Sequence, residues 1–270
     1  MISKNFNKFS FSASPSHHIW NRALIDELAR KGHDVTYFSP DHDKNFHSNV
    51  RQILAEDVYT KLHAEINIED MVKNTKISEL IADLDEFGIG NCKHVIESKG
   101  FEKLLEIVKK ETFNLIIFDF SINECVLPIA NELKGVPIVG VSPFGGTPIS
   151  HSIAGNPEML AIRPIVFLPF SANMTLLERI KNVLVHYYYM YDRHFYYLPK
   201  EVELARTRFP NVKKEDIDGV IDRFSLLLVN NHFSIDPPIP TVPGLIHVGG
   251  LQVKPPKALP EVNCCNYDNG

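Results

Sequence analysis

The stretch that decides the fold is Ser14-Pro-Ser-His-His-Ile-Trp-Asn-Arg-Ala-Leu-Ile-Asp-Glu-Leu-Ala-Arg-Lys-Gly-His-Asp-Val-Thr-Tyr-Phe-Ser39. It predicts a loop, a helix and a strand. Pro15 blocks a helix from entering this segment, and the hydroxyl of Ser16 is expected to cap the new helix by accepting a hydrogen bond from its first turn. Gly32 can adopt the left-handed conformation that ends a helix, and residues 35–38 form a β-prone run.

The predicted helix is amphipathic. Apolar side chains at helical spacing share one face: Trp20, Ala23, Leu24 and Leu28. The other face carries acid–base pairs four residues apart, Asp26 with Arg30 and Glu27 with Lys31. We therefore expect one face to be buried and the other to meet solvent.

Two histidines, His17 and His18, lie at the start of this helix. The partial positive charge of a helix N-terminus favours a neutral imidazole over an imidazolium. A neutral imidazole can act as a general base. The alternative is that both histidines belong to a loop and only help to close the first turn.

A second informative stretch covers residues 113–142. Leu115 to Phe118 is a short apolar run typical of a buried parallel strand; a helix of about twelve residues should follow, then a Lys-Gly stop and a strand at 138–141. Two such strand–helix–strand units predict a Rossmann-like, doubly wound parallel α/β sheet. In such sheets ligands bind outside the carboxyl ends of the strands, and Asp119 lies at one of these ends.

Shorter patterns predict the remaining elements. A first strand is expected at 8–13 and another near 58–66, with helices at 77–84 and 92–110. The Tyr-rich run 186–197 is expected to pack between helices with its hydroxyl groups at the surface.

Composition limits the class of protein. A chain of 270 residues with 44% apolar content can build one large domain or two small ones. Its net charge of -5 comes from interspersed acidic and basic residues, which argues against a nucleic-acid partner. The four cysteines, Cys92, Cys125, Cys264 and Cys265, lack C-x-x-C spacing, so we expect neither a zinc site nor a disulfide framework.

A catalytic pair is the hypothesis that these patterns favour. If the first strand is correct, His17 and Asp119 lie at the same edge of the sheet, although about a hundred residues separate them. The carboxylate would hold one ring nitrogen and stabilise the imidazolium, leaving the other nitrogen to deprotonate a hydroxyl nucleophile. The alternative for Asp119 is a helix cap or a turn residue.

Several motifs resemble the N-terminal half of animal UDP-glycosyltransferases, including the UDP-glucuronosyltransferases. They are Ser16-His17 ahead of a helix that ends Lys31-Gly-His-Asp-Val-Thr36, and Phe118-Asp119 with Cys125 six positions on. Similarity to the insect-type members lies in further stretches: Gly155-Asn-Pro157, 173–182, 225–232 and 242–260.

The resemblance implies a two-domain transferase of GT-B architecture, associated with detoxification and xenobiotic metabolism. Such an enzyme moves a hexose from a UDP-sugar, UDP-glucose or UDP-glucuronate, to a hydroxyl of a small lipophilic acceptor with inversion. By this resemblance residues 1–253 form the acceptor-binding domain, His17 is the base, and Asp119 orients and charges it.

The chain departs from that pattern at its end. Residues 254–270 are interpreted as the start of an interdomain linker and a divergent tail, with the UDP-sugar-binding domain absent. We expect little or no transfer by the chain alone, since catalysis needs the donor carbon held against the nucleophile. The alternative is a catalytically silent fragment that captures lipophilic ligands or pairs with a full-length relative, as a homo- or hetero-dimer.

Four residues are candidate acceptor contacts: His18, Ser142, Phe144 and Gly145. Phe144 and Gly145 open a Gly-rich turn after the strand at 138–141, which is expected to form a cleft wall. No cofactor or metal site is expected within this chain.

The expected location depends on which signal is followed. The resemblance implies the endoplasmic reticulum membrane or lumen. Residues 1–12, however, lack the apolar stretch of a signal peptide, and no apolar run reaches about eighteen residues. As written, the chain is therefore expected to be soluble and cytoplasmic.

Overall fold

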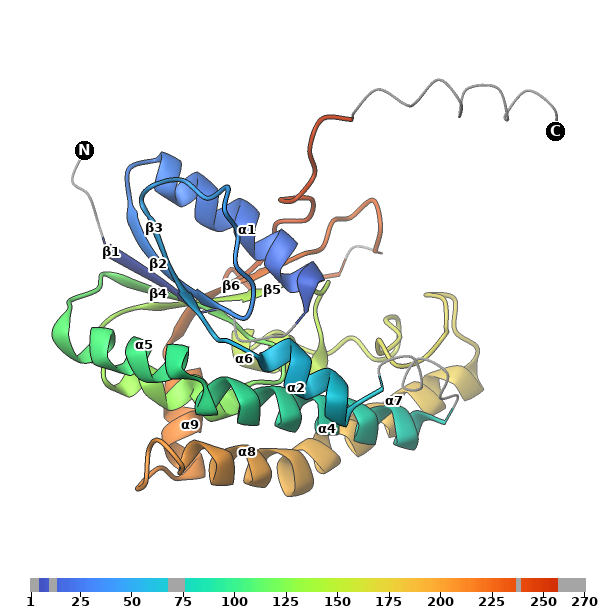
Figure 1. Ribbon diagram of the computed structural model, residues 1–270. Helices are drawn as coiled ribbons and strands as arrows, with labels where there is room; N and C mark the ends of the chain where they lie inside the picture. Colours follow the sequence, from blue (N-terminus) through green and yellow to red (C-terminus); the bar gives the residue numbers. More distant parts are fainter. Residues whose placement is uncertain (1–4, 10–13, 68–75, 237–238, 257–270) are drawn as a thin grey trace, which may run out of the picture.

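The computed structural model describes residues 5–9, 14–67, 76–236 and 239–256. A seven-stranded parallel sheet runs through the molecule in the order β3-β2-β1-β4-β5-β6-β7 (Figure 1). The strands are β1 (Asn5–Phe9), β2 (Asp34–Ser39), β3 (Val50–Leu54), β4 (Leu115–Asp119), β5 (Ile138–Ser142), β6 (Phe224–Val229) and β7 (Leu245–His247). The order runs outward in both directions from β1 and β4, which confirms the predicted doubly wound sheet.

Helices cover both faces of this sheet. They are α1 (Pro15–Arg30), α2 (Val58–Glu65), α4 (Ile77–Glu97), α5 (Lys99–Lys110), the 3-10 helix η1 (Glu124–Asn131), α6 (Pro148–Ala154), α7 (Leu176–Asp192), the π-helix η2 (Arg193–Tyr197), α8 (Leu198–Ala205) and α9 (Lys214–Ile221). Figure 1 shows α1 on one side of the strands, and α2, α4, α5, α8 and α9 on the other.

The central strand β4 contributes side chains to both layers. Ile117 packs with Trp20 of α1, whereas Ile116 and Phe118 belong to the larger core beneath α4 and α5. This alternation follows from the two-residue period of a strand. Both faces of β4 are therefore dry, and its carboxyl end is held rigidly.

The start of α1 differs from the prediction for Ser16. The helix begins at Pro15 with Ser14 as its N-cap, and no side-chain cap hydrogen bond is made. Proline suits the first helical position because it has no N–H that needs an acceptor. Ser16 lies exposed inside the first turn, so the predicted cap was wrong.

The buried face of α1 is also rotated from the predicted one. Trp20 is buried as expected, but the other buried positions run His17, Asn21, Ile25 and Ala29, at four-residue spacing. Two polar residues occupy this stripe, so a search for apolar periodicity placed its centre incorrectly. The ion pairs at Asp26 with Arg30 and at Glu27 with Lys31 are present. Gly32 ends the helix with φ +86°, as predicted.

Three predicted elements were wrong, two between the informative stretches and one inside the second. Residues 58–65 form helix α2, with Val58 and Leu62 buried one turn apart, and the strand is β3 instead. The helix predicted at 77–84 continues as α4 through Gly88, a glycine that leaves room for Tyr197: a Cβ there would lie 2.9 Å from the Tyr197 hydroxyl. The helix after β4 is the 3-10 helix η1, with Pro128 inside it.

A disulfide joins Cys92 of α4 to Cys125 of η1, with the two Cα atoms 6.3 Å apart. The expectation of no disulfide was therefore wrong. The partners are 33 residues apart in sequence, and short-range cysteine spacing carries no information about such a pair. Cys264 and Cys265 lie outside the described residues.

The Tyr-rich run is divided between core and surface. Tyr189 and Tyr197 are buried, whereas Tyr187 and Tyr191 are 65% and 53% exposed. The expectation that the whole run packs between helices was correct for only part of it. The run covers the end of α7 and all of η2. Because consecutive helical residues point in different directions, some of its rings face the core and others face solvent.

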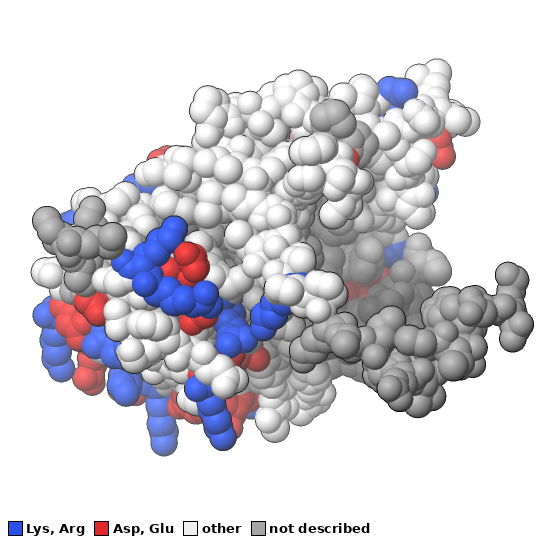
Figure 2. Space-filling view, turned by 90° about the horizontal axis from the view of Figure 1, so that it is seen from above, with Lys and Arg blue, Asp and Glu red and all other residues white. Residues whose placement is uncertain are grey.

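Other expectations concern the ends of the chain. The first strand, predicted at 8–13, overlaps β1 (Asn5–Phe9) only at residues 8 and 9; residues 10–13 and the tail from residue 257 lie outside the described residues. None of the described helices has both the length and the apolar character needed to cross a bilayer. Figure 2 shows acidic and basic side chains intermixed on the face seen from above, without a patch of one sign.

Candidate active site

The candidate site lies where the strand order reverses, at the carboxyl ends of β1 and β4. These two strands are adjacent and parallel, with Phe9 opposite Phe118. Helix α1 follows β1 and presents His17 near its start, and β4 ends at Asp119. Ligands of doubly wound sheets bind at this reversal point.

His17 and Asp119 meet there. Nδ1 of His17 lies 3.2 Å from Oδ2 of Asp119, and the two residues are 4% and 0% exposed. The carboxylate accepts two further hydrogen bonds, from Nδ2 of Asn21 at 2.5 Å and from Oγ of Ser121 at 3.0 Å. Asn21 lies one turn after His17 on α1, and Ser121 lies two residues after Asp119. Sequence analysis missed both, although their spacing from the two predicted residues is a usable signal.

This geometry fixes how the imidazole is used. A carboxylate only accepts hydrogen bonds, so Nδ1 carries the proton and Nε2 of a neutral ring has a free lone pair. His17 lines a cavity of about 210 Å³. Its other lining residues are Ser16, Ile19, Trp20, Pro143, Phe144, Asn230 and Gln252. A hydroxyl group bound in this cavity can therefore approach a base.

The backbone after β4 is strained next to this pair. Ile122 has φ +46°, a left-handed conformation that β-branched residues rarely adopt and that costs about 1–3 kcal/mol. The side-chain amide of Asn123 donates to the backbone oxygen of Asp119 at 2.8 Å and closes the turn. The turn places the Ser121 hydroxyl within hydrogen-bond distance of the Asp119 carboxylate. Strain of this kind is typical of functional sites.

A second cavity of about 320 Å³ lies behind the pair and is mostly apolar. Phe144 lines this cavity as well as the one at His17, and Ser121 connects its wall to Asp119. The Phe144 ring meets the His17 ring edge-on, with centroids 5.2 Å apart. The two cavities are therefore neighbours across one aromatic side chain.

The other predicted acceptor contacts lie in different positions. Ser142 is buried, and its hydroxyl accepts a hydrogen bond from the backbone N–H of Phe144 at 3.3 Å. The carbonyl oxygen of Gly145 accepts from Arg163 at 2.9 Å. Both residues thus shape the turn that carries Phe144 and line neither cavity beside it.

His18 faces away from Asp119. Its Nδ1 lies 3.2 Å from the Tyr37 hydroxyl and its Nε2 lies 3.9 Å from Asp43, whose carboxylate also pairs with Arg22 at 2.5 Å. Burial lowers the pKa of His18 and outweighs the nearby Asp41 and Asp43 carboxylates, which raise it. The residue lines a third, more polar cavity of about 780 Å³ between α1 and residues 251–254.

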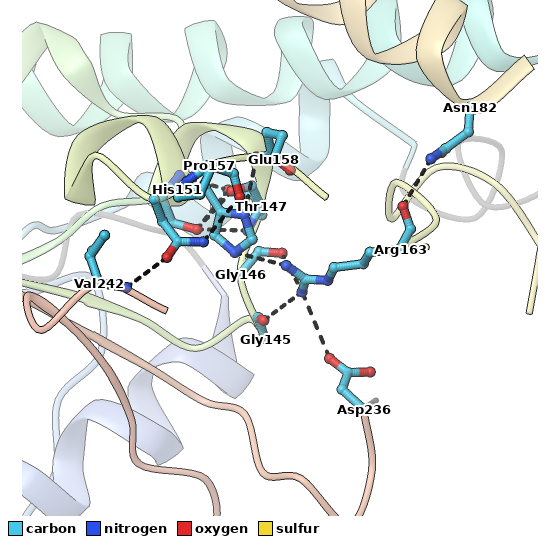
Figure 3. A network of polar contacts seen from close by, with 12 residues as sticks. Gly145, Gly146, Thr147, His151, Pro157, Glu158, Arg163, Asn182, Asp236 and Val242 are labelled. Atoms are coloured by element: carbon cyan, nitrogen blue, oxygen red, sulfur yellow. Dashed lines mark hydrogen bonds and ion pairs between the residues drawn. The ribbon is translucent and has the colours of Figure 1, made fainter. Parts of the chain in front are cut away.

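Arg163 holds the turn that carries Phe144 (Figure 3). Its guanidinium donates to the carbonyl oxygens of Gly145 at 2.9 Å and Gly146 at 3.2 Å, and to Nε2 of His151 at 2.7 Å. Since a guanidinium only donates, His151 accepts at Nε2 and carries its proton on Nδ1, 3.1 Å from Glu158. Sequence analysis did not identify this network.

One group among the described residues has the composition of a metal site: Cys92, Cys125 and Glu201, whose ligand atoms lie within 4.8 Å of one another. The two sulfur atoms are joined in the disulfide, and metal binding requires free thiolates. This group therefore serves the fold and offers no thiolate ligands.

Comparison with known proteins gives consistent results. The family model for UDP-glucoronosyl and UDP-glucosyl transferase matches residues 9–267. UDP-glucosyltransferase 2 of Dactylopius coccus is 28% identical over 259 residues, which cover 91% of this chain and 48% of that protein. UDP-glucuronosyltransferase 3A1 of Xenopus laevis is 23% identical, with coverages of 91% and 47%.

Solved structures are also similar to this chain. The structure of Phytolacca americana UGT2 complexed with UDP-2fluoro-glucose and pterostilbene is 12% identical, covers 93% of this chain and 55% of its own, and gives a TM-score of 0.45. The chain spans about half the length of the curated relatives it matches.

Proposed function

Because the chain belongs to the UDP-glucoronosyl and UDP-glucosyl transferase family, we propose that it forms the acceptor-binding part of an inverting UDP-glycosyltransferase of GT-B architecture. The acceptor is a small lipophilic molecule with a hydroxyl group, bound by residues 1–253. Residues 254–270 lead toward the part of the relatives that this chain does not span, and that part supplies most of the UDP-sugar site.

The buried pair His17 and Asp119 is the observation that carries this proposal. Nε2 of His17 takes the acceptor's proton as the hydroxyl oxygen attacks the anomeric carbon of the sugar. The bond from that carbon to the UDP oxygen breaks, and UDP leaves with the electron pair on the opposite side, which inverts the configuration. The Asp119 carboxylate stabilises the imidazolium that forms.

The apolar cavity beside the pair supports a lipophilic acceptor. Burial of apolar surface contributes about 25 cal/mol per Å² of binding free energy, so a ring system gains most from a wall of this kind. Phe144 contacts the His17 ring and lines the cavity, so it is the residue best placed to orient the ring that bears the reacting hydroxyl.

The cellular location is inferred from a disulfide and an N-glycosylation sequence. The disulfide between Cys92 and Cys125 favours an oxidising compartment, as in the lumen of the endoplasmic reticulum. Asn173 is exposed and begins the sequence Asn173-Met-Thr175, a site for N-glycosylation in that compartment. We therefore favour the lumenal location over the cytoplasmic one.

A second function is favoured by the two small cavities lined by residues of this chain. In it the chain is a binding module that captures lipophilic molecules without transfer, alone or paired with a relative. Both functions predict that the chain binds a phenol without UDP, so transfer separates them: a protein carrying this chain and the remaining half transfers hexose to the phenol only under the first.

The transferase proposal is tested by the variant His17→Ala. It is made in a protein that carries this chain together with the remaining half found in the relatives, natural or joined by fusion. We expect hexose transfer to a phenol to fall by about 10²–10⁴-fold, while calorimetry shows phenol binding to be retained. Transfer at the original rate by His17→Ala would exclude His17 as the base.

A further inference from the structure

The apolar cavity behind Asp119 has a polar side, formed where α4 meets α7. We infer, on the basis of the proposed function, that this cavity selects acceptors with a second hydrogen-bond donor, a hydroxyl or an amine, away from the reacting hydroxyl, and that Asp85 receives this donor. The substrate class is thus a lipophilic ring compound with two donor groups.

Most of the cavity wall makes no hydrogen bonds. Its apolar lining consists of Leu80, Leu84, Phe120, Ile122, Phe144, Ile149, Val166, Phe167 and Tyr189. These side chains come from α4, the strained turn after β4, the turn after β5, α6, the segment between α6 and α7, and α7. A fused or linked ring system fits such a wall, because flat apolar surfaces bury the most area there.

The polar part of the lining consists of the hydroxyl residues Ser121 and Thr147 and three charged residues: Asp85 of α4, Glu124 of η1 and Arg193 of η2. Arg193 donates to Glu124, and both residues are buried. Their charges therefore cancel within the wall. Asp85 has a different neighbour, the carboxyl group of Asp192, which contributes to raising its pKa.

The partnership between Asp85 and Asp192 leaves an excess of acceptors. Burial raises the pKa of Asp85 to about 8, with contributions from Asp192, while Arg193 and Lys200 act in the opposite direction. At neutral pH the Asp85 carboxyl group therefore holds a proton, and its carbonyl oxygen can still accept a hydrogen bond. Beside it, Oδ2 of Asp192 is buried and has no hydrogen-bond partner among the described residues.

The chemical group that a ligand places beside Asp85 determines how tightly the ligand binds. A hydroxyl or amine donates to Asp85 and replaces the water that the ligand displaces. A hydrocarbon end leaves the carboxyl group dehydrated without a partner, which is unfavourable. A carboxylate end loses its water in a largely apolar cavity and, among the described residues of the lining, finds no cation free to pair with it beside Asp85, since Arg193 is paired with Glu124; this is more unfavourable still. We therefore expect binding affinity to decrease from ligands with a donor at this end, to those with a hydrocarbon end, to those with an anionic end.

Calorimetry with a matched naphthalene series tests this order on the full chain. The probes are 2,6-dihydroxynaphthalene, 2-naphthol and 6-hydroxy-2-naphthoic acid, which share one ring system and one reactive hydroxyl. We expect the diol to bind about tenfold tighter than the mono-ol, and the acid to bind about tenfold weaker than the mono-ol. Asp85→Leu should remove the preference for the diol and leave the affinity of the mono-ol equal or higher.

Glu86→Gln is the matched control. Glu86 is the next residue on α4, is exposed and does not line the cavity, so loss of its charge should leave the order intact. Asp85→Ala is a second variant in case Asp85→Leu does not fold: it removes the acceptor oxygen without adding bulk and should likewise remove the preference for the diol.

The inference is overturned if the original chain binds diol and mono-ol equally, if it binds none of the probes, or if a folded Asp85→Leu or Asp85→Ala variant keeps the preference for the diol. Failure of the proposed function looks different. In that case the binding order persists, while a protein carrying this chain and the remaining half transfers no sugar to any of the probes.

Discussion

His17 and His18 are neighbours at the start of α1, yet their surroundings differ in every respect that matters for proton transfer. His17 faces the sheet, and one ring nitrogen meets a buried carboxylate that also accepts hydrogen bonds from the neutral side chains of Asn21 and Ser121. His18 faces the opposite side, and both of its nitrogens have partners, Tyr37 and Asp43.

The comparison shows that an aspartate near a histidine does not by itself make a base. Asp43 is already paired with Arg22, so little of its charge remains to stabilise an imidazolium on His18. The hydrogen bonds that Asp119 accepts from Asn21 and Ser121 come instead from neutral groups. Helix geometry separates the two rings by about 100°, which puts one on the buried face of α1 and the other beside solvent.

The strongest test of this contrast exchanges each aspartate for asparagine. In a protein carrying this chain and the remaining half, Asp119→Asn should lower kcat/KM for transfer by about 10³-fold, because the amide favours the wrong tautomer of His17. Asp43→Asn should change it by less than about threefold. Equal losses in the two variants would mean that the aspartates do not differ in function.

The disulfide is expected to stabilise the region around His17 more than the region around His18. Cys125 follows Asn123 and Glu124 directly, so the wall behind His17 is covalently linked to α4, whereas no such link is described near His18. Replacing Cys92 and Cys125 by serine should lower the free energy of unfolding by about 3 kcal/mol, measured by urea titration. A reducing agent should destabilise the original chain by a similar amount and leave the double variant unchanged.

Each histidine also has an aromatic neighbour, which provides a matched pair of variants. Phe144 lies edge-on to His17 at 5.2 Å, and Phe46 lies edge-on to His18 at 6.2 Å. Phe144→Ala should weaken binding of a phenol by about five- to tenfold, since an aromatic pair contributes about 0.5–1.5 kcal/mol beyond area burial. Phe46→Ala should leave this affinity within twofold, roughly the scatter of such measurements. If calorimetry shows a larger loss of phenol affinity in Phe46→Ala than in Phe144→Ala, the acceptor binds on the His18 side instead.

The smallest effect concerns pH. Since burial lowers the pKa of His18, the unfolded chain takes up a proton at a higher pH than the folded chain does. Stability is therefore full above the unfolded pKa of about 6.5 and falls as the pH drops through it. His18→Gln should flatten this part of the profile, measured by urea titration between about pH 5 and 8. A steeper profile in the variant would contradict the sign.

The same contrast explains what the sequence could predict. The strand–helix–strand units, the position of Asp119 and the helix start at His17 all follow from local periodicity, and parallel topology then brings the pair to one edge. Asn21 was not identified, because a polar residue on the buried face of a helix interrupts the apolar pattern. Its hydrogen bond to Asp119 is visible only when α1 and β4 are placed side by side.

Long-range features were missed for a related reason. The bond between Cys92 and Cys125 and the contact of Arg163 with Gly145 each join segments whose local patterns are independent. Asp85 is another case: on α4 it looks like an ordinary helical carboxylate, and only the approach of Asp192 from α7 makes it part of a cavity. Such sites depend on how helices pack, which periodicity does not determine.

The place of β1 in the middle of the sheet has a consequence for biosynthesis. One edge of β1 pairs with β2 soon after both leave the ribosome, but the other must wait for β4, and the His17–Asp119 pair spans 102 residues. At about 5–20 residues per second, translation takes roughly 5–20 s to cover that interval. During this time the free edge of β1 can form non-native strand pairs. Chaperone binding should therefore matter most before residue 119 emerges from the ribosome.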